Sequence, residues 1–257
     1  MGKKRRQQRQ LDMAVTAIQR RYGPWSLVRG KPAGTAAREA GVAHISTGFA
    51  ALDQALAIGG LPRGRICELV GPATSGKTTL ALKFLAQAQV GGREVAYVDQ
   101  ALYFDPDYAH RCHLDLSHLL VSTSHDLHEA LAMIEALAQS GGVAAIVFDA
   151  LDFLWTDPIA ASLLAATLNR LPAPLARSNS TLLVLHESPA DGSPALSALA
   201  HHAAVRLQVV RERWLRLQGD VRGYEARVEV LKNRLGPAGR SVQIAIEFNG
   251  TVRGNGL

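Results

Sequence analysis

Cysteine is almost absent from this chain: Cys67 and Cys112 are the only two among 257 residues. This scarcity excludes a disulfide-stapled scaffold, and the lack of a CxxC pair argues against a cysteine zinc site. No run of about eighteen apolar residues is present, so the sequence predicts no membrane span. The basic N-terminus is not followed by an apolar segment and does not resemble a secretory signal. We therefore expect a cytoplasmic protein with both thiols reduced.

Acidic residues are outnumbered by basic ones, which gives a net charge of +6. With 47% hydrophobic and 19% charged residues, the balance is that of a globular domain with one large core. The excess of positive charge favours a polyanionic partner such as single-stranded DNA. It is concentrated in an N-terminal tail with Lys3, Lys4, Arg5, Arg6 and Arg9. A solvated tail without a partner remains the alternative.

Apolar spacing divides the chain into a small N-terminal segment and a core. We expect residues 1–10 to be disordered, Leu11–Tyr22 to form an amphipathic helix and Gly30–Gly41 to be a linker. The predicted domains are thus a basic tail, oligomerisation helix and linker over 1–41, and a core over 42–257. In the core, short apolar strands alternate with helices, which predicts a mainly parallel sheet covered on both faces and antiparallel at its late strands. The predicted strands are Arg65–Val70, Glu94–Asp99, Leu119–Ser122, Val143–Asp149, Thr181–His186, Val205–Val210, Tyr224–Leu231 and Ser241–Ile246, and the helices are Thr78–Gln89, Leu127–Gln139 and Ile159–Arg170.

The clearest motif follows the first predicted core strand and opens the first core helix. It fits G-x-x-x-x-G-K-[ST], a phosphate-binding P-loop whose backbone N–H groups cradle phosphate oxygens. The helix N-terminus adds its positive dipole end. Lys77 is expected to reach the β- and γ-phosphates and Thr78 to bind Mg²⁺. The predicted nucleotide-binding residues here are Gly71, Pro72, Ala73, Thr74, Ser75, Gly76, Lys77, Thr78 and Thr79.

A second nucleotide element is the apolar strand that ends at Asp149. This is the Walker B pattern, in which the carboxylate completes the coordination of Mg²⁺ directly or through water. Alone the pattern is weak, but downstream of a P-loop it is strong. The sequence thus predicts a site for ATP and Mg²⁺.

Several further segments resemble the bacterial RecA recombinase family. They include Ile45-Ser46-Thr47-Gly48, Gly59-Gly60-Leu61-Pro62, Asp105-Pro106 with Tyr108-Ala109, Val205-Arg206-Leu207 and Lys232-Asn233-Arg234. The resemblance covers about residues 11–250 and implies a RecA-type α/β ATPase core that binds ATP between neighbouring subunits of an oligomer. It also implies that Tyr108 stacks on adenine and Asp105 contacts its edge. Lys232 and Arg234 resemble the basic pair that reaches the γ-phosphate of the adjacent subunit.

Departures from the family pattern lie at positions that matter for chemistry. The water-orienting Glu of the family aligns with Ala101, which can neither accept a proton nor position water. The family's γ-phosphate sensor Gln aligns with Glu187. Beside a triphosphate this carboxylate is repelled unless it is protonated or has a cationic neighbour such as Arg234. The alternative is that Glu187 is a relocated general base. The segments that align with the family's DNA-binding loops, at Trp155–Ala161 and Ser188–Pro194, are short. His201 stands at the position of an aromatic residue that couples the nucleotide and DNA sites in the family. We also expect the family's C-terminal domain to be absent.

These features predict a shortened RecA-like protein. Its departures resemble those of the ImuA-type proteins, which serve mutagenic translesion synthesis. We expect an accessory or regulatory subunit in DNA repair, with weak or no hydrolysis, that assembles with itself or with a RecA-type partner. The alternative is an enzyme: a slow DNA-dependent ATPase and recombinase in which Glu187 is catalytic.

Overall fold

The computed structural model describes residues 2–23, 41–100, 102–124, 126–150, 157–187, 194–218 and 220–248. The chain divides into two compact units, residues 1–41 and 42–257. The first unit contains helix α1 (Gly2–Tyr22), with Leu11, Met13 and Ile18 exposed. The expectation of disorder over residues 1–10 is wrong, because α1 begins at Gly2. This stretch is rich in Lys, Arg and Gln, whose unbranched side chains lose little freedom in a helix.

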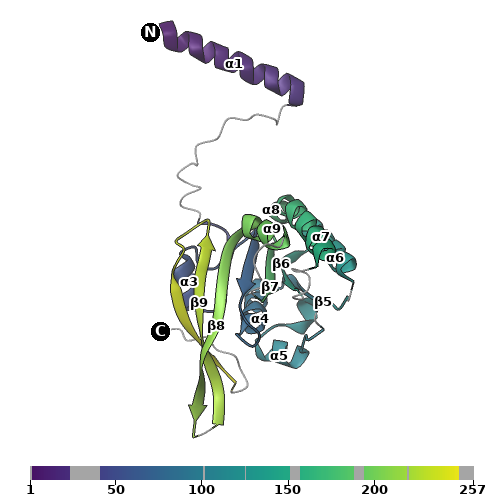
Figure 1. The fold of residues 1–257 in the computed structure, drawn as a ribbon, viewed down its shortest axis with the longest axis vertical. Helices are drawn as coiled ribbons and strands as arrows, with labels where there is room; N and C mark the ends of the chain where they lie inside the picture. The colour runs from purple at the N-terminus through teal and green to yellow at the C-terminus, as the bar shows by residue number, and fades with distance from the viewer. Residues whose placement is uncertain are drawn as a thin grey trace. The chain divides into compact units, whose positions relative to one another are not determined.

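An eight-stranded sheet forms the centre of the second unit (Figure 1). Its order is β10-β9-β8-β3-β7-β6-β4-β5, and a separate antiparallel pair joins β1 (His44–Ile45) to β2 (Leu61–Pro62). All neighbours from β8 to β5 pair in parallel, whereas β9 is antiparallel to both β8 and β10. The strands are β3 (Ile66–Val70), β4 (Glu94–Asp99), β5 (Leu119–Ser122), β6 (Val143–Asp149), β7 (Thr181–His186), β8 (Ala203–Leu217), β9 (Asp220–Asn233) and β10 (Ser241–Glu247).

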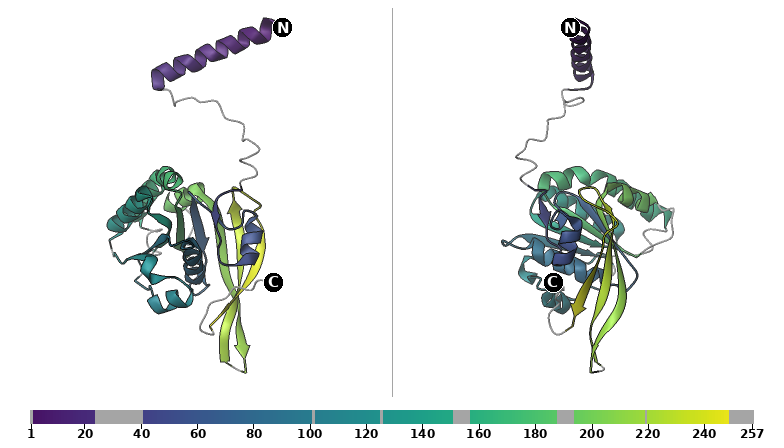
Figure 2. Two further views of the ribbon diagram at one scale, coloured as in Figure 1. Left: turned by 180° about the vertical axis from the view of Figure 1, so that it is seen from behind. Right: turned by 90° about the vertical axis from the view of Figure 1, so that its left-hand side faces the viewer.

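Helices cover both faces of this sheet (Figures 1 and 2). One face packs against α3 (Ala50–Leu56), α4 (Lys77–Ala88) and α5 (Pro106–Arg111), which is followed by the short helix η1 (Leu116–His118). The other packs against α6 (Leu127–Ser140), α7 (Pro158–Arg170), α8 (Pro172–Ser178) and α9 (Pro194–His202). Each face of the sheet therefore has its own cluster of buried apolar side chains. The predicted fold class, a RecA-type α/β core with a mainly parallel sheet, is confirmed.

Acidic caps fix where the helices begin. The carboxylates of Asp105, Asp126 and Asp157 accept backbone N–H bonds at the starts of α5, α6 and α7. Pro106 and Pro158 occupy first-turn positions, where the missing N–H costs nothing. Among the described helices, none alone is long and apolar enough to cross a bilayer, and only the bent pair α7–α8 meets that length and composition together.

The predicted strands of the parallel region match the structure to within one residue. By contrast, β8 and β9 are much longer than expected and form a hairpin that extends beyond the other strands (Figure 1). This hairpin is rich in arginine and glutamate. Cross-strand ion pairs, such as that between Arg213 and Glu225, stabilise its extended backbone. Short helices such as α3 and α5 have too few turns to give a periodic signal.

Candidate nucleotide-binding site

The P-loop, residues Gly71–Thr78, lies at the carboxyl end of β3. Its backbone is held closely by the neighbouring strands. The Gly71 N–H donates to the carbonyl of His186, and a Cβ at position 71 would stand 2.2 Å from the Val209 carbonyl oxygen. Gly76 has φ of +107°, which favours glycine, just before α4 begins at Lys77. The loop therefore has the strand–turn–helix geometry that the sequence predicts.

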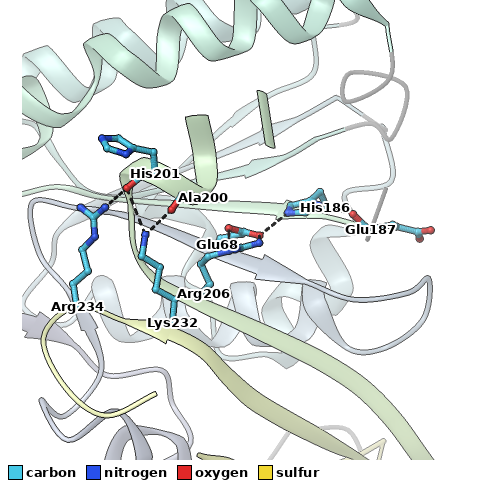
Figure 3. A network of polar contacts seen from close by, with 8 residues as sticks. All are labelled: Glu68, His186, Glu187, Ala200, His201, Arg206, Lys232 and Arg234. Carbon is cyan, nitrogen blue, oxygen red and sulfur yellow. Dashed lines mark hydrogen bonds and ion pairs between the residues drawn. The ribbon is translucent and has the colours of Figure 1, made fainter. Parts of the chain in front are cut away.

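Lys77 points back over its own loop. Its Nζ donates to the carbonyl oxygens of Gly71 at 2.6 Å and Pro72 at 2.9 Å. The same Nζ lies 4.0 Å from Oε1 of Glu187, which follows β7. The cation next to Glu187 is thus the P-loop lysine and not Arg234, which corrects that expectation. Figure 3 shows Glu187 and Arg234 at opposite ends of a polar network.

The candidate magnesium residues lie at the start of α4 and at the end of β6. Thr78 is exposed in the first turn of α4. Asp149 ends β6, and its Oδ2 accepts a 2.6 Å hydrogen bond from the hydroxyl of Tyr97. Burial, with the nearby Asp149 charge, raises the pKa of Tyr97 well above its ordinary value, so the phenol remains a donor. Carboxylate and hydroxyl oxygens suit Mg²⁺, and these side chains fit that ion.

Tyr97 is a residue that sequence reasoning missed. It is buried in β4, and its hydroxyl fixes the orientation of the Asp149 carboxylate. Two residues further along β4, Asp99 pairs in register with Asp149 and is also buried. Asp99 Oδ2 accepts from the Phe104 N–H at 2.7 Å, which holds the following loop.

The predicted base-binding residues belong to α5. The Tyr108 hydroxyl lies 2.5 Å from Oγ1 of Thr79, so α5 and the start of α4 are joined directly. Burial is the main cause that raises the pKa of Tyr108. Asp105 caps α5 by accepting the Tyr108 N–H at 3.0 Å, so one of its oxygens serves the helix start.

A cavity of about 290 Å³ lies beside the P-loop. Residues from Thr74 to Thr79 and Tyr108 line it, together with four side chains that the sequence analysis did not select: Arg211, Trp214, Tyr224 and Phe248. The first three belong to the β8–β9 hairpin. Their only signal in the sequence was the alternation of aromatic and charged residues, which is common in exposed strands.

A buried ionic network crosses the sheet next to this site (Figure 3). Glu68, 1% exposed in β3, accepts two hydrogen bonds from Arg206 at 2.6 and 3.0 Å and lies 3.0 Å from Nε2 of His186. Burial alone would raise the pKa of Glu68, but the hydrogen bonds from His186 and Arg206 hold it below the ordinary value. The His186 Nδ1 contacts the carbonyl of Glu187, so the network adjoins the residue beside Lys77.

The basic pair Lys232 and Arg234 lies at the other end of this network. Lys232 Nζ donates to the Ala200 carbonyl at 2.5 Å, and Arg234 donates to the carbonyl of His201. These are the last-turn carbonyls of α9, where a helix dipole favours positive charge. Partial burial and the nearby Arg234 lower the pKa of Lys232. Neither side chain contacts the P-loop of its own chain in these hydrogen bonds.

Some predicted positions lie outside the described residues. They are Ala101, residues 155–156 of the first loop and residues 188–193 of the second. His201 is described: it stands at the end of α9 with its ring 4.8 Å from that of His202, centroid to centroid.

A mainly parallel sheet with a glycine-rich loop between a central strand and a helix defines an α/β protein of the P-loop class. The RecA N-terminal domain family matches residues 9–253. Among similar proteins, Protein RecA of Blastochloris viridis is 35% identical over 93% of this chain and 74% of its own length. Protein RecA of Rubrobacter xylanophilus is 34% identical over 93% and 74%, and that of Brucella anthropi is 33% identical over 96% and 73%. The chain belongs to the RecA family and is a RecA-like protein of DNA repair and recombination.

Proposed function

We propose that this chain binds ATP with Mg²⁺ and acts as an accessory or regulatory subunit in DNA repair, with weak or no hydrolysis. The observation that carries ATP binding is the P-loop at the end of β3 with Lys77 folded over it. Lys77 donates to two loop carbonyl oxygens, and its hydrogen bonds to the charged oxygens of a triphosphate would be stronger than these. Thr78 and Asp149 supply the oxygen ligands for Mg²⁺.

Weak hydrolysis is supported by the groups around this loop. Ala101 stands at the family's water-orienting position. The carboxylates of Asp99 and Asp149 each accept a hydrogen bond from the protein, from the Phe104 N–H and the Tyr97 hydroxyl. Glu187 faces the phosphate-binding lysine at 4.0 Å, which suits an electrostatic neighbour of Lys77 better than a base for water.

A role for Lys232 and Arg234 in a neighbouring subunit is part of the same proposal. Their hydrogen bonds reach the carbonyls of α9, away from the P-loop of their own chain. In an assembly with a second copy or a RecA-type partner, these cations are available to a nucleotide held by the adjacent molecule. The basic helix α1 is proposed to serve assembly and single-stranded DNA contact.

Binding of a fluorescent ATP analogue tests the first step. Lys77→Ala is expected to abolish binding, whereas Lys232→Ala, the matched loss of one lysine, is expected to retain it when the protein is dilute and monomeric. Unchanged binding by Lys77→Ala would refute the P-loop proposal. ATP turnover with and without single-stranded DNA then separates the accessory subunit from a DNA-dependent ATPase.

A further inference from the structure

The β8–β9 hairpin supplies much of the wall of the cavity beside the P-loop. Trp214 and Phe248 keep 43% and 46% of their surfaces exposed there, although both are large apolar side chains. Ligand cavities are typically lined by aromatic rings with a few polar groups placed among them. The polar groups in this wall are the Arg211 guanidinium and the Tyr224 hydroxyl.

Tyr224 fixes this aromatic wall to the P-loop. Its ring lies 5.9 Å from that of Trp214 and 5.7 Å from that of Phe248, centroid to centroid. Its hydroxyl is 3.4 Å from Oγ1 of Thr79, and a Cβ added to Gly76 would stand only 2.8 Å from the same hydroxyl oxygen. The rings are therefore held in place before any ligand arrives, which lowers the entropic cost of binding.

Arg211 holds Trp214 from the P-loop side. Its guanidinium carbon lies 4.2 Å from the centre of the indole ring. The same group donates to the carbonyl and hydroxyl oxygens of Thr74 at 3.3 and 3.1 Å. The Arg211 cation over the indole ring and the edge-to-face contact with Tyr224 set the orientation of Trp214. Even so, 43% of the Trp214 surface stays exposed.

Tyr108 lines the same cavity and is half-buried. Its hydroxyl is bound to Thr79, and the Arg111 guanidinium lies 5.5 Å from its ring centre. We propose that the base of the bound nucleotide stacks on the indole of Trp214, so that the β8–β9 hairpin holds the nucleoside. This inference rests on the proposed function, because the nucleotide is placed by the P-loop. Stacking uses the π-face that every base has, so the site tolerates different bases.

Calorimetric titration with two probes, Mg·ATP and magnesium tripolyphosphate, tests this proposal. Tripolyphosphate has the phosphate chain without a base. We expect Trp214→Ala to weaken ATP binding by about fivefold or more, and to leave tripolyphosphate binding unchanged. Trp214→Phe keeps a stacking ring and should lose less. Val221→Ala is the matched control, because Val221 lies on the same hairpin and is 42% exposed.

The outcomes separate the two proposals. Equal losses for both probes in Trp214→Ala, or no loss for ATP, would overturn the stacking proposal; so would equal wild-type affinities for the two probes. If Lys77→Ala abolishes binding of both probes while Trp214→Ala alters neither, only the stacking proposal fails. If Lys77→Ala leaves both probes bound, the proposed function fails, and the stacking proposal that rests on it fails too. Thermal melting of each variant shows whether the hairpin is still folded, and Trp214→Phe gives a second reading if Trp214→Ala is not.

Discussion

Lys77 and Glu187 face each other across the P-loop, with Nζ and Oε1 4.0 Å apart. The Glu187 carboxylate offsets part of the positive charge of Lys77, which attracts a triphosphate. It also repels the phosphates directly. Because Glu187 is 41% exposed, water screens this effect. We expect Glu187→Gln to tighten ATP binding by roughly two- to fivefold, a gain typical of a solvent-screened pair. Equilibrium titration at low and high salt measures it, and weaker binding in Glu187→Gln would contradict this role.

Hydrolysis depends on a different position. The wild-type chain should turn ATP over far more slowly than about 1 s⁻¹, the low end of ordinary enzymes, because Ala101 provides no group to orient water. Ala101→Glu should raise the rate, and Ala101→Gln, which cannot act as a base, is the control. A fast wild-type rate that is lost in Glu187→Gln would instead identify Glu187 as the base and favour the recombinase alternative.

We expect Tyr97 to affect Mg²⁺ binding only through its hydrogen bond to Asp149. In Tyr97→Phe the 2.6 Å hydrogen bond is lost while the buried ring is kept. We expect a loss of about 1–2 kcal/mol in the free energy of unfolding, and weaker dependence of ATP binding on Mg²⁺ because Asp149 is less well oriented. Urea unfolding and ATP titrations at several Mg²⁺ concentrations measure the two effects. An unchanged magnesium dependence would show that Tyr97 serves packing only.

The Glu68 network makes stability depend on pH. The pKa of Glu68 in the folded chain is below its ordinary value of 4.5, so the unfolded state binds protons more readily there. The stabilising contribution is therefore complete above about pH 4.5 and is lost as the pH falls through the lower folded-state value. Glu68→Gln should cost about 2–3 kcal/mol near neutral pH, and the difference from wild type should shrink in acid.

Urea unfolding at a series of pH values checks this expectation. Glu225→Gln is the control, since Glu225 also pairs with an arginine, Arg213, but on the exposed hairpin. Its substitution should have a much smaller effect. A Glu68→Gln defect that stays constant down to acid pH would show that packing, not the carboxylate charge, is responsible.

DNA binding through α1 should be electrostatic. Lysines and arginines that neutralise phosphates release counterions, so affinity for single-stranded DNA should fall steeply with salt and show little sequence preference. Replacing Lys3, Lys4, Arg5, Arg6 and Arg9 by Gln removes the charge and retains good helix formers. Each lost phosphate contact should lower the slope of log affinity against log salt by about 0.7. Salt-tolerant, ATP-dependent binding in this variant would show that the core itself holds DNA.

The parallel sheet could be read from the sequence because its strands are buried on both faces and therefore form continuous apolar runs. The P-loop could be read because its chemistry is confined to neighbouring residues. The aromatic wall could not, since Trp214 meets Tyr224 only through cross-strand pairing, and Tyr224 reaches Gly76 from a distant part of the sequence. For the same reason, Glu68 and Arg206 gave no signal: parallel pairing of β3 with β8 brings them together from distant positions.

Strand β9 joins the two ends of this arrangement within one stretch of backbone. Tyr224 lies against Gly76 of the P-loop, and Lys232, eight residues later (232 − 224), lies at the last carbonyls of α9. At about 3.3 Å per residue these positions are about 26 Å apart. One strand thus carries both a residue that lines the P-loop cavity and a residue at the end of α9. Substitutions that disturb the backbone of β9 are therefore expected to alter both the wall of this cavity and the contact of Lys232 with α9.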